Sequence, residues 1–328
     1  KITALCDIFP EKAKRLIDIF GLEDVSIYTD YKEMLQDGDI DIVHVAVPNP
    51  LQCRLTVDAL NAGKHVLCEK PMALTKAECG EMIAAAKRND RKLTVGFQWR
   101  YRPEALYIKE ACDKGQLGDI YYAKAHAVRY RAVPYWGEYI TGNNGGGILI
   151  DGAPHALDLT LWAMNNYEPY SVKAHTYRKM AGRPEGNIWG EWPEDDFKVE
   201  DTGIAMITMK NGATILLEAA WSMNMLSKDM TATLVGTQAG IDMQNDGGVR
   251  INGVQNGKPY VTELDMSIPD APFSIKPVAP MYRESQEFIR AIRVNGEPFV
   301  KPEQAMVVTQ IIEGIYESAK TGREVFFE

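Results

Sequence analysis

Several features that would point to other classes of protein are scarce or missing from this chain. The five cysteines among its 328 residues are odd in number and form no C-x-x-C pair, which favours neither a zinc ribbon nor a disulfide framework. No apolar run approaches the roughly 20 residues that a membrane-spanning helix needs. We therefore expect a protein of the reducing cytoplasm with no membrane partner.

Positive charge is not in excess either. The chain has 36 Lys and Arg residues against 45 Asp and Glu residues, which gives a formal net charge of −9. Such a charge repels phosphate backbones and anionic lipid surfaces. Nucleic acid is therefore not an expected partner.

The first hundred residues alternate between strand-like and helix-like segments. Pro10 opens a helix in which Ala13 and Ile17 recur at helical spacing, and Thr75 with Glu78 forms a capping box before another helix. This alternation predicts an α/β fold with a doubly wound parallel sheet. Strands are predicted over residues 2–6, 25–28, 42–47, 64–68 and 93–97.

The pattern changes near residue 100. Lys210-Asn211-Gly212 is a strong hairpin turn between two long strand candidates, so this half is expected to hold an antiparallel or mixed sheet. We predict a first domain over residues 1–100 and a second over 101–328. Its strands are predicted at 120–128, 172–177, 202–209 and 213–221, its closing helices at 282–295 and 302–320, and a surface loop at 183–198.

Ligands of an open parallel sheet bind at the carboxyl ends of its strands. Asp7 stands where a dinucleotide-binding fold places the acid that holds the adenosine ribose, although an acid after a strand is more often a helix cap. No basic residue follows Asp7 closely, which favours NAD over NADP. Lys70, after another strand, could equally be a surface lysine paired with Glu69.

A second cluster runs from Gly145 to Asp158. If the segment after Asp151 is helical, Asp151, His155 and Asp158 share one face, and the preceding glycines allow a close approach of backbone to a ligand. The same spacing also occurs in an ordinary pair on a helix surface. It is formally a metal-ligand spacing too, but no third histidine supports a metal.

Taken together, these motifs resemble the Gfo/Idh/MocA oxidoreductase family, which includes glucose-fructose oxidoreductases and inositol dehydrogenases. The order and spacing of the motifs agree over almost the whole chain. Three departures are the absent G-x-G-x-x-G loop, Gln52 in place of a usual histidine, and Gly152-Ala153-Pro154 between the Asp and the His. The matching segments are Val47-Pro48-Asn49, the run 62–71 that ends in Glu69-Lys70-Pro71, Gly96-Phe97 with Arg100-Tyr101-Arg102-Pro103, and Gly146-Gly147 leading to Asp151, His155 and Asp158.

A strand, the glycine turn and a helix would normally precede Asp7 in this family. The chain begins Lys1-Ile2-Thr3, without methionine, inside a strand-like run. We therefore expect an N-terminal truncation that removed the turn and any signal segment.

The resemblance implies a Rossmann domain joined to an α/β domain with a large, mostly antiparallel sheet, and a homodimer or homotetramer. It implies NAD as cofactor and a small sugar or polyol as substrate. By position, the reaction centre would be Lys70, Asp151 and His155. The cofactor would contact Asp7, Pro48, Asn49, Glu69, Lys70 and Gln98, and the substrate would contact the reaction centre with Asp158, Tyr282, Arg100 and Trp136.

The expected reaction moves a hydride between a secondary alcohol and the nicotinamide. His155 is predicted to act as the base, Asp151 to orient its imidazole, and Lys70 to donate a hydrogen bond to the alcohol oxygen. Three alternatives remain open: redox-assisted cleavage of a glycoside, a dinucleotide-binding sensor without catalysis, and a metal-dependent hydrolase or isomerase.

Overall fold

The N-terminal part of the computed structural model is built from parallel strands and helices in alternation, as predicted. The structure describes residues 1–136, 138–225, 230–244, 247–266 and 279–328. The parallel strands are hydrogen-bonded as two sheets, β1-β2 and β3-β4-β5. The strands are β1 (Ala4–Cys6), β2 (Ser26–Tyr28), β3 (Ile42–Val45), β4 (His65–Cys68) and β5 (Leu93–Val95), and the helices between them are α1 (Pro10–Phe20), α2 (Tyr31–Leu35), α3 (Asn49–Asn61) and α4 (Lys76–Arg88).

Local signals set the ends of these helices. The capping box predicted at Thr75 and Glu78 is present at the start of α4, and the Asp30 side chain caps α2. Gly21 adopts a left-handed conformation, with φ of 58°, at the end of α1. Of the apolar residues of α1, Ala13 is buried, whereas Leu16 and Phe20 are exposed.

The second part contains one large sheet. Its strand order is β13-β12-β11-β10-β6-β9-β8-β7-β14, and among these neighbours only β6 and β9 run parallel. The mostly antiparallel sheet is thereby confirmed, as is the turn at Lys210-Asn211-Gly212. The strands are β6 (Ile120–Val128), β7 (Pro169–Tyr177), β8 (Thr202–Met209), β9 (Thr214–Ala220), β10 (Met230–Gly236), β11 (Ala239–Met243), β12 (Val249–Gln255), β13 (Lys258–Leu264) and β14 (Val325–Phe326).

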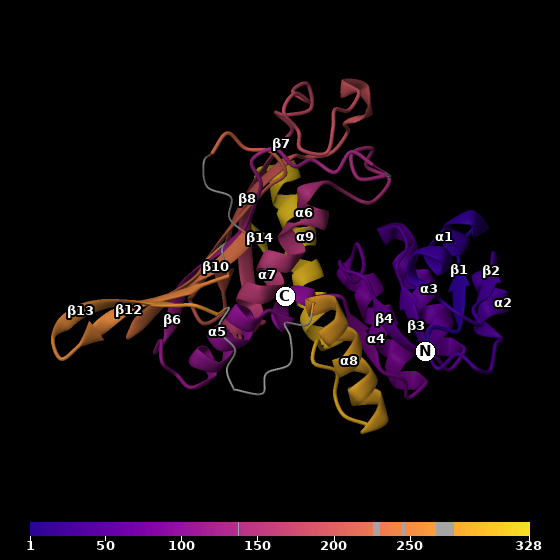
Figure 1. Cartoon of the computed structure of the whole chain (residues 1–328). Helices are drawn as coiled ribbons and strands as arrows, with labels where there is room; N and C mark the ends of the chain where they lie inside the picture. Colours follow the sequence, from indigo (N-terminus) through magenta and orange to yellow (C-terminus); the bar gives the residue numbers. More distant parts are fainter. Residues whose placement is uncertain (137, 226–229, 245–246, 267–278) are drawn as a thin grey trace.

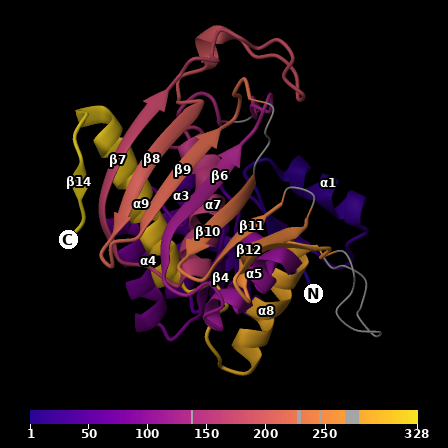
Figure 2. The same ribbon diagram turned by 90° about the vertical axis from the view of Figure 1, so that its left-hand side faces the viewer.

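Helices cover one face of this sheet. Figure 1 shows α7 and α9 packed between the sheet and the N-terminal part, and Figure 2 looks onto the opposite face of the sheet. None of the described helices is long and apolar enough to cross a bilayer. The helical segments are η1 (Gln98–Tyr101), α5 (Pro103–Asp113), α6 (Ile148–Asp151), α7 (Ala153–Met164), η2 (Glu194–Asp196), α8 (Pro280–Arg293) and α9 (Pro302–Thr321).

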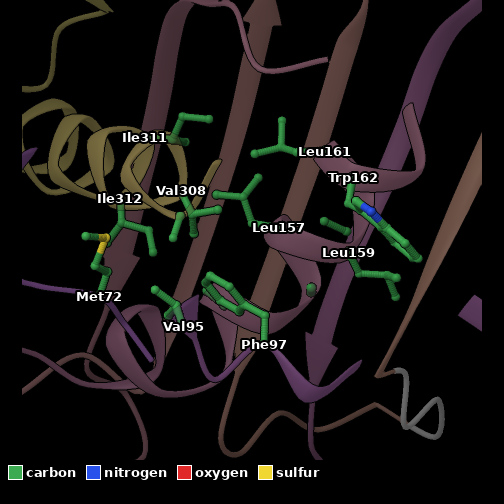
Figure 3. Close-up of a cluster of buried hydrophobic side chains, with 14 of the residues drawn as sticks. Met72, Val95, Phe97, Leu157, Leu159, Leu161, Trp162, Val308, Ile311 and Ile312 are labelled. Atoms are coloured by element: carbon green, nitrogen blue, oxygen red, sulfur yellow. The ribbon is translucent and has the colours of Figure 1, made fainter. Parts of the chain in front are cut away.

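One apolar core joins the two parts. Figure 3 shows Val95 and Phe97, at the end of β5, beside Leu157 of α7 and Val308 of α9. The Thr94 hydroxyl also donates a hydrogen bond of 2.9 Å to a carbonyl just before α9. The end of β5 is therefore packed against α7 and α9. The domain boundary at residue 100 stays a prediction.

Candidate active site

Lys70 follows β4, and its side chain reaches across to the end of α6. Its ammonium nitrogen donates to the Asp151 carbonyl at 2.8 Å and lies 3.3 Å from the Asp151 carboxylate. The two side chains are 14% and 13% exposed. The structure thus brings together two predicted residues that are 81 positions apart, and it leaves both accessible.

Two further donors hold the Asp151 carboxylate. Arg129 lies 3.3 Å from it, and the Trp221 indole N–H donates to it at 2.7 Å. Burial alone would raise the pKa of Asp151, but the charges of Lys70 and Arg129 and the Trp221 hydrogen bond outweigh burial and lower it. Asp151 is therefore an ionised carboxylate among three donors.

Sequence reasoning missed Arg129 and Trp221. They follow directly after β6 and β9, the two strands that pair in parallel, so both side chains arise at the same edge of the large sheet. A parallel pairing of strands whose partner residues are 92 positions apart leaves no local pattern that would have marked them.

His155 lies in the first turn of α7 with 8% of its surface exposed. Its ring stacks on Trp99, with centroids 5.0 Å apart and planes at 13°, and meets the edge of Phe97. Burial, followed by the charge of Lys70, holds the pKa of His155 well below 6.5, so the imidazole is neutral at pH 7.

The predicted orientation of His155 by Asp151 does not agree with these contacts. The Asp151 carboxylate is bound by Lys70, Arg129 and Trp221, whereas the Nδ1 atom of His155 is buried without a hydrogen-bond partner. The imidazole is instead positioned by ring packing against Trp99 and Phe97.

Asp151, His155 and Asp158 do not lie on one continuous helix. The chain forms α6 and then α7, because Pro154 has no N–H group to continue the hydrogen bonds of α6. The Asp158 carboxylate accepts two hydrogen bonds from Arg100, at 2.8 and 2.6 Å, and both side chains are 0% exposed.

This pair corrects two of the substrate contacts predicted above. Arg100 and Asp158 have no exposed surface that a substrate could touch, so the prediction of direct contact is wrong. Arg100 also donates to Gln304 of α9 at 2.7 Å. The pair therefore ties η1, α7 and α9 together.

The glycines before α6 serve packing within the protein rather than the approach of a ligand. A side-chain carbon at Gly146 would lie 2.1 Å from the Tyr316 hydroxyl, and one at Gly147 would lie 2.0 Å from a carbonyl oxygen of Glu200. The Glu200 carboxylate accepts hydrogen bonds from the backbone N–H groups of Gly147 and Leu149 and so caps α6. The expectation of a backbone–ligand contact here is not supported.

The remaining substrate candidates lie near the surface. Trp136 is 49% exposed and belongs to a group of aromatic side chains beside Arg129. Tyr282 is 57% exposed in the first turn of α8, a helix that packs against η1. Their contact with a substrate stays a prediction.

The cofactor candidates stand at the carboxyl ends of the parallel strands. Asp7 follows β1 and accepts the N–H of Phe9 at 2.8 Å, so it forms a turn before α1 rather than capping the helix. Pro48 precedes α3, and the Asn49 backbone and side chain both bond to Asn144. Asn49 thus links the sheet to the loop before α6.

Glu69 follows β4, and Gln98 follows β5, the other two strands of the sheet that contains β3. The Glu69 carboxylate lies 3.3 Å from His44. It fits beside residue 96 because Gly96 has no side chain. Burial raises the pKa of Glu69, but His44 and Lys70 outweigh burial and bring that pKa below the usual value. Gln52, the departure noted in the sequence, donates to the Glu69 carbonyl at 3.2 Å and so supports this strand end.

No group of three or more His, Cys, Asp or Glu side chains within the described ranges is arranged to hold a metal ion. The five cysteines are free thiols.

The fold and the strand-end site are those of a dinucleotide-dependent oxidoreductase with an attached α/β domain. The chain belongs to the Gfo/Idh/MocA family: residues 1–97 match its NAD-binding Rossmann domain and residues 109–327 its C-terminal alpha/beta domain. It is accordingly an NAD-binding oxidoreductase acting on CH–OH groups.

Two kinds of relatives support this assignment. D-glucoside 3-dehydrogenase of Escherichia coli is 29% identical over 327 residues, which cover 99% of this chain and 90% of that protein. Inositol 2-dehydrogenase of Salmonella typhimurium is 31% identical over 183 residues, covering 55% of this chain and 52% of that protein. Levoglucosan dehydrogenase in complex with NADH has the same fold, with a TM-score of 0.84 at 23% identity, over 100% of this chain and 90% of that one.

Proposed function

We propose that this protein oxidises a secondary alcohol of a sugar or sugar derivative, with Lys70, Asp151 and His155 as the reaction centre. The observation that carries the proposal is the accessible Lys70–Asp151 pair beside a neutral His155 at the strand ends. Relatives named for D-glucosides, inositol and levoglucosan support a hydroxyl-bearing ring as substrate.

The strand-end residues fit the nicotinamide half of NAD. Glu69 and Lys70 stand at one strand end and Gln98 at the next, while Asp7 stands at the end of β1 for the adenosine ribose. When bound, NAD supplies the acceptor for the hydride. The residues described below supply the proton transfer and the electrostatics.

Lys70 is the donor that stabilises negative charge on the substrate oxygen. Its ammonium is fixed by the Asp151 carbonyl and carboxylate, so little reorganisation is needed when that charge develops. Asp151 balances the two cations, Lys70 and Arg129, which would otherwise repel each other in a nearly buried site.

His155 takes the proton of the alcohol. Since Nδ1 is enclosed, the exposed part of the ring offers Nε2 to a substrate hydroxyl. The lowered pKa keeps the imidazole neutral and ready to accept a proton, and the nearby Asp151 carboxylate offsets part of the cost of the imidazolium.

His155→Ala tests this assignment. Loss of a general base lowers the turnover number by about 10²- to 10⁴-fold. The measurement is NADH formation at 340 nm with a panel of methyl glycosides, inositols and anhydrosugars. The exposed His175 provides the matched control, because it lies on β7, which β8 separates from β9 and β6 in the sheet, and His175→Ala should keep the wild-type rate.

The pH profile gives a second readout. Because the pKa of His155 lies well below 6.5, the rate of oxidation should stay constant as the pH falls through 6.5 and decline only below that value.

Near-full turnover by His155→Ala would refute the assignment. Product formation without NADH would indicate redox-assisted cleavage instead of net oxidation.

A further inference from the structure

A group of aromatic side chains lies on the surface beside the reaction centre. Trp136 meets Tyr135, Tyr139 and Trp189 edge to face, with ring centroids 6.0, 6.4 and 5.0 Å apart. Trp136 is 49% exposed, and Tyr135 and Trp189 are each 39% exposed. We call these four residues the aromatic platform. Edge-to-face contacts are a preferred arrangement of aromatic rings, so the side chains hold one another in place.

Two loops build this platform and are bonded to each other. The side chain of Asn187 accepts from the Val133 N–H at 2.8 Å and donates to the Val133 carbonyl at 3.1 Å. The Ile188 N–H donates to the Arg131 carbonyl at 3.1 Å. The segment predicted as a surface loop, 183–198, lies in the loops at the top of Figure 1 and supplies Trp189. The exposed rings are therefore carried by two loops that hydrogen bonds hold together.

The platform continues directly into the reaction centre. The Arg129 guanidinium lies over the Trp189 ring, 5.6 Å from its centroid, and the same group binds the Asp151 carboxylate. Tyr139 is half-buried, and burial together with the charges of Asp151 and Glu69 raises the pKa of its phenol. Trp189 is thus separated from Asp151 by a single guanidinium group.

A polar rim borders the aromatic surface. Arg131 donates to the Ser222 hydroxyl at 2.8 Å and to the Asn224 side chain at 2.6 Å. Exposed apolar surface rimmed by polar groups is typical of a binding site. A sugar ring matches such a surface, because it presents C–H groups on its faces and hydroxyls around its edge.

We propose that the aromatic platform binds a second sugar ring, so that the substrate is a disaccharide rather than a single ring. This inference rests on the proposed function: the ring that is oxidised lies at Lys70 and His155, and the ring joined to it lies against Trp136 and Trp189. The glycosidic link crosses the Arg129 guanidinium.

The test compares the kcat/KM of disaccharides with that of methyl glycosides that share the oxidised ring. Cellobiose is compared with methyl β-D-glucopyranoside, and maltose with the α-anomer, with NAD⁺ at 340 nm. For one of the two linkages, the wild-type kcat/KM should be higher for the disaccharide than for the methyl glycoside. Trp136→Ala and Trp189→Ala should each lower this ratio by about tenfold, because each removes one aromatic ring that contacts the sugar. Trp136→Phe and Trp189→Phe should retain most of it.

Tyr121→Ala is the matched control, because Tyr121 is a 55% exposed aromatic on β6 outside both loops. It should leave the ratio unchanged. An unchanged ratio in both tryptophan variants would overturn the inference. This includes the case in which kcat/KM falls equally for both substrates, since Trp189 would then act through Arg129 on Asp151. A change of oligomeric mass with an unchanged ratio would assign the surface to an interface between copies and would also overturn it.

Failure of the proposed function gives a different result. If the wild-type protein oxidises none of these sugars, the reaction assigned to Lys70 and His155 is wrong. Calorimetric binding of cellobiose or maltose that is lost in Trp136→Ala would still support the platform, and no binding to the wild-type protein would refute it.

Discussion

Two carboxylates seven residues apart, Asp151 and Asp158, have opposite surroundings. Asp151 shares its charge among Lys70, Arg129 and Trp221 and stays accessible. Both carboxylate oxygens of Asp158 accept hydrogen bonds from the Arg100 guanidinium, and the Asp158 side chain has no exposed surface. An enclosed pair of this kind joins elements of the fold but offers no exposed atom to a substrate. An accessible carboxylate among several donors can exchange a contact for a substrate, and this difference separates the proposed reaction centre from the enclosed pair.

The largest expected effect concerns the enclosed pair. Asp158→Ala leaves the Arg100 charge buried without its partner, which should cost about 3 to 5 kcal/mol of stability. Denaturant unfolding measures the loss. The double variant Arg100→Met/Asp158→Ala should recover much of it, because no buried charge is then left over.

Glu110 of α5 supplies the control for this prediction. It forms an exposed pair with Lys114, so Glu110→Ala should cost far less than Asp158→Ala. Equal losses from the two single variants would mean that burial of the Arg100–Asp158 pair does not matter for stability.

Next in size is the effect of opening the accessible pair. Lys70→Met should lower kcat by about 10²- to 10³-fold, the loss of one donor to a developing oxyanion. The melting temperature should change less than in Asp158→Ala, because Arg129 and Trp221 still hold Asp151. A drop in melting temperature as large as that of Asp158→Ala, with little change in kcat, would assign Lys70 to structure instead.

A third carboxyl sharpens the comparison, since Glu284 of α8 is 3% exposed and its Oε1 atom has no hydrogen-bond partner. Burial, with the charges of Glu69 and Asp158, raises the pKa of Glu284 to about 8. The folded protein therefore keeps a proton that the unfolded chain releases above its ordinary pKa of 4.5. This contribution to stability is complete below pH 4.5 and is lost as the pH rises through 8.

As the pH rises from 5 to 9, the stability of Glu284→Gln relative to the wild-type protein should therefore increase, by at most a few kcal/mol. The free energies of unfolding at the two pH values measure the gain. Glu287→Gln, at a partly exposed position on the same helix, should give the same difference at both pH values. A constant difference for Glu284→Gln would show that its carboxyl is ionised throughout.

Most elements of the fold were predictable because their signals are local. Hydrophobic period and caps predicted α4 and α9 closely, and the strand β8 with its turn at 210–212. The strands β10 to β13 were missed. For β12 and β13 the reason is that most of their residues are exposed and carry little apolar alternation. The break between α6 and α7 was missed as well, although Pro154 could have indicated it.

Motif order and local periodicity were enough to predict the family, the parallel and antiparallel halves, and the candidates Lys70, Asp151 and His155, because these signals do not depend on contacts between distant segments. The contacts of each residue became known from the folded structure. It enclosed Asp158 with Arg100, gave Asp151 the donors Arg129 and Trp221, and set His155 against Trp99. Burial and charge neighbours arise from segments far apart in the chain, and these set which carboxylate is enclosed and which stays accessible.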